Sequence, residues 1–176
     1  LSKMDLGIEI DGKIKGRINN LSARELQVKV GKATYVKGNF VVKGLPNFNK
    51  TFLDLKFDQV ATNKADLDYI ILKATGNKKS QIPVIVNKFG NVNFRGNFKG
   101  FINDFTANGE FKTKLGRLKS DVKLKMDGAG IPTYKGKVQA FDFNIGQLLD
   151  EKTLGKTTLK ADIKGRGFEM KNLKQK

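Results

Sequence analysis

The 176-residue sequence predicts an all-β protein, an elongated antiparallel sheet with one or two short helices. The first observation is strict alternation: from Leu118 to Met126, apolar or small residues take the even positions and charged residues the odd ones. A period of two places alternate side chains on opposite faces of a strand. The second observation is that no long helical pattern is present to cover the apolar face. What buries that face therefore becomes the question on which function depends.

Ten strands are expected from the alternation and from the turn signals between them. They are Met4–Ile10, Lys13–Ile18, Glu25–Val30, Thr34–Lys43, Thr51–Asp58, Asn91–Phe98, Phe105–Thr113, Arg117–Met126, Thr133–Phe143 and Thr157–Gly165. Asp11-Gly12 predicts a tight hairpin between the first two. Gly31-Lys32 can turn the third into the fourth, and Asp127–Pro132 breaks the chain before the ninth. Short sequential connections favour an antiparallel meander.

Two segments depart from the period of two. Thr62–Leu72 begins with a capping residue and carries acids in its first turn, which favours a short helix. Its end, Tyr69–Leu72, fits a strand equally well. Asn144–Asp150 has a cap followed by one or two helical turns, and Lys78–Val86, which contains Pro83, is expected to be a loop or an edge strand.

A triplet of apolar residue, basic residue and glycine recurs along the chain. It opens similar passages at Ile14-Lys15-Gly16, Phe94-Arg95-Gly96 and Ile163-Lys164-Gly165. We therefore expect a single β-domain over residues 1–176, with internal repeats at approximately 13–75, 92–151 and 157–176, the last of them partial. Glycines inside strands permit bends and bulges, so the sheet should coil, and the repetition indicates contacts between neighbours only.

The charge is strongly positive, with 34 Lys and Arg against 17 Asp and Glu and a net charge of +17. Such an excess suits an acidic partner: nucleic acid, an anionic lipid surface or a polyanionic glycan. The even spread of the lysines favours another explanation, that they keep the sheet soluble and protect its edges. Phenylalanines and lysines also fall on opposite faces, as in Phe94–Lys99, unlike a base-stacking platform. No nucleic-acid partner is therefore expected.

The sequence contains no histidine and no cysteine. The commonest general base and the usual zinc and iron–sulfur ligands are therefore missing. Gly128-Ala129-Gly130 is followed by Pro132 and does not form a phosphate-binding loop. We expect no catalytic residue, no metal and no cofactor, and we predict that the protein is not an enzyme.

The apolar face supplies the candidate site. Its expected lining residues are Leu26, Val28, Val36, Phe40, Val42, Leu53, Leu55, Phe57, Val92, Phe94, Phe98, Phe105, Phe111, Leu118, Val122, Leu124, Met126, Tyr134, Val138, Phe141, Phe143, Leu159 and Ile163. Pattern alone favours an ordinary sandwich core, since apolar strand faces are usually buried. The functional alternative is a sheet folded over without full closure, which leaves a lipid-accessible channel. A transmembrane barrel is the third possibility, but the absence of Trp leaves no aromatic girdle.

Two long passages, Gly96–Met126 and Pro132–Phe168, resemble the TamB family of translocation and assembly module proteins, relatives of the AsmA-like envelope proteins. The phrases that carry the resemblance are Asn97–Phe101, Ala107–Gly109 followed by Leu115-Gly116, Asn144–Leu149 and Leu154–Thr157. These are strand-and-turn signatures, and they cover most of the chain, most clearly from Val92 onward.

The resemblance implies a taco-shaped β-groove with an apolar lining. It implies a non-enzymatic, periplasmic protein that moves phospholipid between inner and outer membranes and supports outer-membrane assembly with a barrel partner. The family is anchored in the inner membrane by an N-terminal helix, which this chain lacks; Leu1 is not an initiator methionine, so we expect a piece of a longer protein. The alternatives are a scaffold β-domain that binds another protein by strand addition and, third, a polyanion binder.

Overall fold

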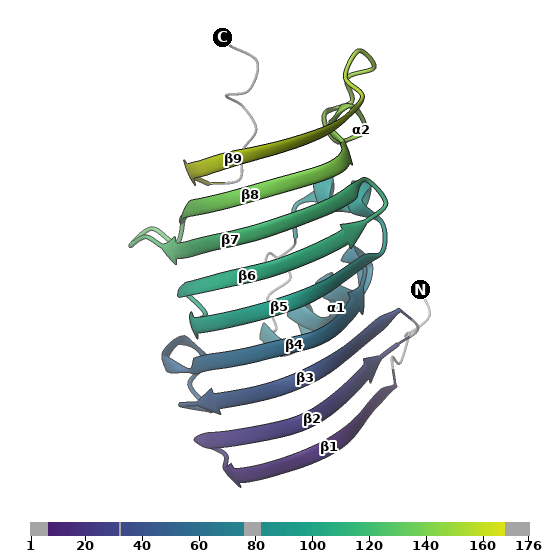
Figure 1. Cartoon of the computed structure of the whole chain (residues 1–176). Coiled ribbons are helices and arrows are strands. Elements are labelled where there is room, and N and C mark those ends of the chain that lie inside the picture. Colours follow the sequence, from purple (N-terminus) through teal and green to yellow (C-terminus); the bar gives the residue numbers. More distant parts are fainter. Residues whose placement is uncertain (1–6, 32, 76–81, 168–176) are drawn as a thin grey trace.

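The computed structural model describes residues 7–31, 33–75 and 82–167. Nine antiparallel strands form one sheet in chain order, so every strand pairs with its neighbours in sequence (Figure 1). The strands are β1 (Ile8–Arg17), β2 (Asn20–Val30), β3 (Thr34–Lys43), β4 (Phe52–Thr62), β5 (Val92–Phe101), β6 (Asp104–Thr113), β7 (Gly116–Met126), β8 (Pro132–Asn144) and β9 (Lys156–Arg166). The predicted all-β meander is confirmed.

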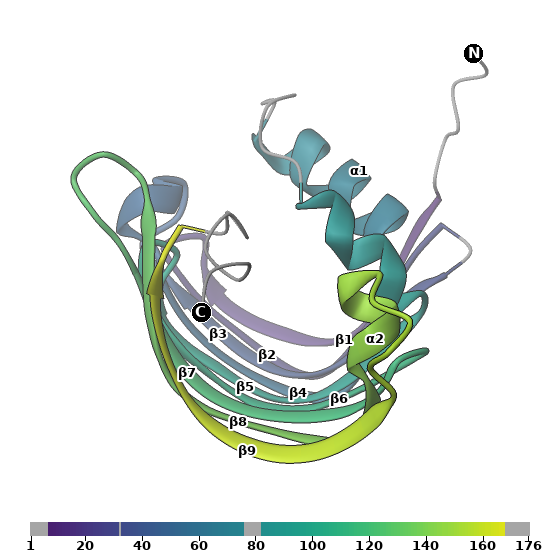
Figure 2. The same ribbon diagram turned by 90° about the horizontal axis from the view of Figure 1, so that it is seen from above.

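Each strand bends along its own length, so the sheet forms an open U when it is viewed along the direction in which the strands follow one another (Figure 2). It is not closed, and in the described part of the chain β1 and β9 are its two edges. The alternative of a sandwich is therefore wrong, because no second sheet packs on the first. Short sequential connections keep each strand beside the previous one. Each further strand therefore extends the sheet in the same direction, across the strands, and the sheet does not fold back on itself.

The two ends of the strands form two different rims. The helix rim carries the α-helices α1 (Lys64–Thr75) and α2 (Ile145–Leu149) and the 3-10 helix η2 (Val84–Phe89). The hairpin rim carries the turns or loops at residues 18–19, 44–51, 102–103 and 127–131; the second of these contains the 3-10 helix η1 (Phe48–Lys50). No helix within the described ranges has the length and apolarity needed to cross a membrane.

The beginning of the sheet differs from the prediction. Met4–Ile10 and Lys13–Ile18 were expected as separate strands joined by a hairpin at Asp11-Gly12, but Ile8–Arg17 is one strand with an irregular register at that dipeptide. Gly12 lies opposite two residues of β2, Glu25 and Leu26, so the extra residue of this bulge belongs to β2 and β1 continues without a turn. The true hairpin is at residues 18–19, and β2 begins at Asn20 instead of Glu25. Residues 4–6 lie outside the described part.

Bulges recur along the sheet and increase its curvature. Register shifts occur between Ala23 and Leu26 in β2 and between Ala140 and Phe143 in β8. Each contains a non-glycine residue in the left-handed region, Glu25 with φ 53° and Asp142 with φ 47°. Bulges bend the strand that carries them and increase its local twist.

Both expected helices are present. In α1, Asn63 Oδ1 accepts the Asp66 backbone N–H at 2.9 Å, which satisfies an otherwise unpaired donor of the first turn. Thr34 Oγ1 donates to Asp66 Oδ2 at 2.8 Å and so ties the helix to β3. The Tyr69–Leu72 segment is helical, so its alternative as a strand is wrong.

The second helix, α2, starts at the expected cap, because Asn144 Oδ1 accepts the Gln147 backbone N–H at 2.9 Å. Of the expected loop or edge strand Lys78–Val86, residues 78–81 lie outside the described part, and η2 begins at Val84. A turn of 3-10 helix replaces the extended chain there.

The hydrophobic core sits at the helix rim, away from the centre of the sheet. Leu115, Ala140 and Phe143 are buried there, and half-buried apolar side chains pack around them: Phe89, Leu118, Leu148 and Leu159. Backbone bonds fasten the same region, since Lys114 N–H donates to Phe89 O at 3.0 Å and Asn144 N–H to Leu115 O at 2.7 Å. The helices are thereby fixed to the ends of β6–β8.

At the other rim, Asp127 joins the β7–β8 loop to the end of β9. Its Oδ1 accepts the Ile131 and Ala129 backbone N–H groups at 2.9 Å each, and its Oδ2 accepts the Arg166 guanidinium at 2.6 Å. Hydrogen bonds lower the pKa of Asp127 below its ordinary 3.8: the bond from the Ile131 N–H has the largest effect, the bond from the Arg166 guanidinium the next, and the bond from the Ala129 N–H a smaller one. Burial raises the pKa, but by less than either of the first two bonds lowers it.

This arrangement predicts a local acid transition. Because the folded pKa of Asp127 is depressed, its stabilising contribution is complete above pH 3.8 and is lost as the pH falls through the folded pKa. The amide resonances of Ala129 and Ile131 should report that loss in an NMR titration. Arg166→Gln removes one cause of the depression, so the midpoint should move up towards 3.8. An unchanged midpoint would show that the ion pair does not form in solution.

Candidate functional site

Three apolar rows run across the full width of the sheet, each made of residues paired directly across neighbouring strands. The first row is Ile10, Val28, Val36, Val60, Phe94, Phe111, Leu118, Ala140 and Leu159; the second is Ile14, Ala23, Phe40, Leu55, Phe98, Ala107, Val122, Gly136 and Ile163; the third is Gly16, Leu21, Val42, Leu53, Gly100, Phe105, Leu124, Tyr134 and Gly165. No charged residue interrupts any of them. The first row lies nearest the helix rim and the third nearest the hairpin rim.

A fourth row, rich in glycine, lies between the first and second. Its members are Leu26, Gly38, Phe57, Gly96, Gly109, Ser120, Val138 and Ala161. The Phe94 ring lies over Gly96 and Gly109: a Cβ on Gly96 would come 2.6 Å from Phe94 Cζ and 2.7 Å from the Gly109 Cα. The absence of side chains at these positions lets the ring lie down along the sheet.

Phenylalanine rings form a continuous ladder across β3 to β6. Ring centroids are 5.2 Å apart for Phe40–Phe57, 5.8 Å for Phe57–Phe94 and 4.6 Å for Phe94–Phe111. These separations are typical of favourable aromatic pairs. The ladder gives the face a smooth hydrocarbon surface without polar atoms.

The apolar rows lie on the concave side of the U. Leu118 and Leu159 of the first row pack in the helix-rim core with Phe89 of η2 and Leu148 of α2. Figure 2 places the helices on the inner side of the curled sheet. The concave face is therefore apolar, and alternation sends the lysines to the convex face.

This apolar face is not a dry core. Among the described residues only Ala23, Val30, Leu115, Ala140 and Phe143 are buried apolar side chains, and nearly all other row members are half-exposed or exposed. Over β1–β4 the face holds a cavity of about 360 Å³ with an entirely apolar lining: Ile14, Leu21, Ala23, Leu26, Val36, Phe40, Val42, Leu53, Leu55 and Phe57. That volume is in the range of small-molecule pockets.

Most of the residues expected from the sequence lie on this concave face. Nineteen belong to the four rows: Leu26, Val28, Val36, Phe40, Val42, Leu53, Leu55, Phe57, Phe94, Phe98, Phe105, Phe111, Leu118, Val122, Leu124, Tyr134, Val138, Leu159 and Ile163. Three more lie at its ends: Val92 pairs with Thr62 at the helix rim, Phe143 is buried in the rim core, and Met126 is exposed at the hairpin rim.

Phe141 is the exception, and its assignment to the lining is wrong. It pairs with Arg117, and the cationic groups of Arg117 and Lys119 lie 5.3 and 5.7 Å from its ring centroid, so it lies on the polar convex face. Alternation after Val138 and Ala140 already places Phe141 on this face, and the bulge that follows returns Phe143 to the concave side. Cation–π attraction then stabilises a half-buried aromatic ring among basic side chains.

Bulges and small residues also explain what sequence reasoning missed. Val60 lies in the first row because the irregular register at Asp58-Gln59 shifts its face. Ile10 follows the alternation of β1 and could have been found by pattern. The small members Ala23, Ala107, Ala140 and Ala161 and the glycines carry no apolar signal, yet they complete the rows.

The rows also define the register of the glycine triplets. Ile14-Lys15-Gly16, Phe98-Lys99-Gly100 and Ile163-Lys164-Gly165 each place their first residue in the second row and their glycine in the third. Phe94-Arg95-Gly96 instead begins in the first row, which is two rows closer to the helix rim than the second row. The repeat boundaries 13–75, 92–151 and 157–176 stay a prediction.

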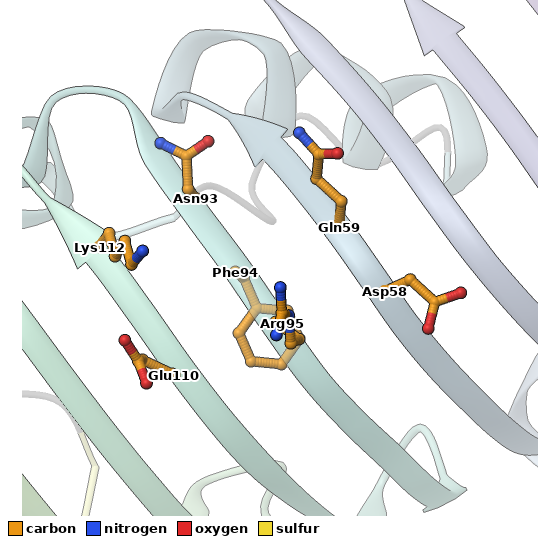
Figure 3. A pocket seen from close by; sticks show the side chains of 7 residues that line it. All are labelled: Asp58, Gln59, Asn93, Phe94, Arg95, Glu110 and Lys112. Carbon is orange, nitrogen blue, oxygen red and sulfur yellow. The ribbon is translucent and has the colours of Figure 1, made fainter.

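The polar face carries a hollow of about 310 Å³ (Figure 3). Its lining comes from three neighbouring strands: Asp58, Gln59, Asn93, Phe94, Arg95, Glu110 and Lys112. Two acids and two bases balance one another, and Glu110 already faces Arg117 and Lys119 at 4.0 and 3.8 Å. The hollow therefore favours neither an anionic nor a cationic ligand, whereas the concave face is uniformly apolar.

The fold and the site together define an open antiparallel β-groove with an apolar lining. Comparison of the chain with protein-family models, with curated proteins and with solved structures gives no match. Within the described ranges, no three acidic side chains gather where they could hold a metal ion. The groove is therefore the feature from which a function is argued.

Proposed function

We propose that the groove binds the acyl chains of phospholipid without catalysing a reaction. The observation that carries this proposal is the three apolar rows, which cross all nine strands. In the described structure only part of the first row packs in the helix-rim core, and most members of the other two rows are half-buried or exposed. Soluble proteins rarely expose a contiguous apolar surface of this extent unless it binds something.

The shape of the groove suits a long, flexible apolar ligand. The groove runs across the strands, and eight inter-strand steps of about 4.8 Å give it a length of about 38 Å. Each methylene removed from water contributes about 0.8 kcal/mol. No polar row interrupts the path, so a tail can lie at many positions, while its headgroup stays in water outside the opening.

The wider role rests on the resemblance to TamB-family sequences. We propose that the chain is part of a bridge-like periplasmic protein that moves phospholipid between the inner and outer membranes. An inner-membrane anchor in a part of the protein outside this chain and an outer-membrane barrel partner belong to the same proposal.

Placing a carboxylate in the first row tests the groove directly. Phe94→Asp should weaken binding of a fluorescent diacyl phospholipid analogue at least about tenfold, because an acyl chain that covers the site would have to desolvate the charge. Val122→Asp in the second row should do the same. Affinity is measured by fluorescence titration, with circular dichroism to verify the fold.

The matched control is Asn93→Asp, next to Phe94 on the convex face. Asn93 is exposed and pairs across the sheet with Lys112, so a carboxylate there meets a cation and leaves the groove unchanged. We expect wild-type lipid affinity. If folded Phe94→Asp and Val122→Asp proteins bind lipid as tightly as the control, the groove is not the lipid site.

A scaffold that binds another protein by strand addition is the second candidate. It is favoured by β1, which is exposed along its whole length and pairs on one side only. An unpaired edge offers backbone donors and acceptors to an extended peptide. Native mass spectrometry separates the two: co-purified phospholipid supports the groove, and a lipid-free chain that captures an extended peptide supports the scaffold.

A further inference from the structure

The two rims of the sheet are chemically different. The helix rim holds a buried apolar core, which includes Leu115 and Phe143. Three large apolar side chains are nevertheless exposed at that rim: Ile8, Val84 and Leu154. The hairpin rim leaves its large apolar side chains in water, with exposed fractions between 36% and 66%: Ile18, Phe48, Phe101, Ile102 and Met126. In the described structure this second rim carries no α-helix, only the 3-10 helix η1 (Figure 2).

These side chains lie along one line. In an antiparallel meander every second connection falls at the same rim, so the tips recur about every 10 Å. Adjacent tips are hydrogen bonded: Gly44 N–H donates to Asn19 O at 2.9 Å, and Met126 N–H donates to Asn103 O at 2.7 Å. The exposed side chains therefore recur along one continuous edge of the sheet, on both of its faces: Met126 ends the concave face, whereas Phe101 lies on the convex face.

Cations border this edge. The tips and the strand ends beside them carry Arg17, Lys43, Lys50, Lys125 and Arg166. Their only carboxylates, Asp104 and Asp127, are already engaged: Asp104 faces Lys123 and Lys125 at 3.5 and 3.7 Å, and Asp127 faces Arg166 at 2.6 Å. The rim therefore presents apolar groups flanked by positive charge.

The charge is most concentrated beside the tip between β7 and β8. Lys123, Lys135 and Lys164 lie directly opposite one another on three adjacent strands. Together with Lys125 and Arg166 they line a hollow of about 620 Å³. Like charges placed directly opposite are destabilising, and within the described residues Lys135 and Lys164 form no ion pair. The same ladder position in β4 and β5 is neutralised, with Asp54 and Lys99 at 2.9 Å.

We propose that the hairpin rim docks on an anionic phospholipid bilayer. Its exposed apolar tips enter the boundary between headgroups and acyl chains, and the row of Lys123, Lys135 and Lys164 faces the lipid phosphates. Interfacial binding of this kind combines buried apolar area with attraction to anionic lipid. Nucleic acid fits less well, because Tyr134, the aromatic residue in the lining of this hollow, belongs to the third apolar row and its ring lies against Gly165 instead of among the lysines.

The test is co-sedimentation of the chain with vesicles of phosphatidylglycerol and phosphatidylcholine, compared with phosphatidylcholine alone. We expect binding to the anionic vesicles, weakened by salt. The double variant Phe48→Ser/Ile102→Ser should lose at least about tenfold in affinity. Lys135→Gln/Lys164→Gln should lose about 25-fold, since each lysine near an anionic surface contributes about fivefold. Its folding stability should be unchanged or higher, because a like-charge contact is removed.

Matched controls come from the other rim. Val84→Ser alters an apolar side chain that is 77% exposed on η2, and Lys114→Gln removes an exposed charge from the β6–β7 turn. Both should bind vesicles like wild type. The proposal fails if these controls lose as much as the rim variants, if the rim variants bind as wild type does, or if duplex DNA competes the chain off the vesicles at equal charge concentration.

Docking and groove binding are separable, because the inference does not rest on the proposed function. Phe94→Asp should lose the diacyl ligand and keep vesicle binding, whereas Lys135→Gln/Lys164→Gln should keep the ligand and lose the vesicles. If instead the rim variants abolish self-association of the chain in sedimentation velocity, and no form binds vesicles, the apolar edge is a protein interface and docking is refuted.

Discussion

Replacing Leu115 by alanine is expected to lower the free energy of unfolding by about 3 kcal/mol, in the range measured for deletion of a buried leucine side chain. Leu115 is only 1% exposed and packs with Ala140 and Phe143 at the helix rim. The surroundings cannot easily collapse into the cavity that the substitution leaves, because Asn144 N–H donates to Leu115 O at 2.7 Å and holds the backbone of the turn in place. The measurement is equilibrium denaturation in urea.

Leu154→Ala provides the matched control for that change. Leu154 is 44% exposed, so the same loss of atoms should cost well under about 1 kcal/mol. If Leu115→Ala costs no more than Leu154→Ala, the helix-rim core does not contribute to the cooperative unit. A large effect confined to η2 and α2 in hydrogen exchange would indicate local unfolding of that rim.

Gly96→Ala is expected to cost about 2–3 kcal/mol, although it adds a single methyl group. The new Cβ would clash with the Asn108 carbonyl oxygen, and it would lie 2.6 Å from Phe94 Cζ and 2.7 Å from the Gly109 Cα. Backbone pairing fixes the distance between β5 and β6, so the ring must lift away from the sheet. The Phe94–Phe111 contact, with centroids 4.6 Å apart, should weaken with it.

Two comparisons make the interpretation of Gly96→Ala specific. Gly128→Ala, in the β7–β8 loop, meets nothing within 4 Å and has no left-handed φ, so it should be neutral or slightly stabilising. In a double-mutant cycle, Phe94→Ala should relieve part of the cost of Gly96→Ala, since the clashing ring is gone. If the two changes in unfolding free energy are strictly additive, the new methyl group clashes with the backbone alone and not with the Phe94 ring.

Stability and binding place opposite demands on the apolar face of this sheet. A second layer on the concave face would bury the rows and stabilise the chain, but it would also fill the site. The chain instead concentrates buried packing at one rim, around Leu115 and Phe143. Neighbouring strands supply the remaining contacts, as in other architectures that extend in one direction.

Alternation was sufficient to predict most of the candidate site, because side-chain direction in a regular strand depends only on position along that strand. It failed where the strand is irregular. A register shift moves Val60 onto the concave face, and Asp11-Gly12 carries a hairpin signal but lies within a strand, opposite a bulge of β2. Phe141, one residue after Ala140, lies on the convex face as alternation requires. A turn and a bulge require similar backbone freedom, and long-range strand pairing decides between them.

The sequence by itself determined the period of two, the separation of apolar from basic faces, both helices and the absence of histidine and cysteine, since these depend on local spacing and composition. Only the tertiary structure decided that the sheet stays single and open, which side is concave, and that one rim is covered while the other is bare. The physical reason is that alternation specifies an apolar face but not its covering. Whether that face becomes a core or a groove depends on pairing and curvature summed over all nine strands.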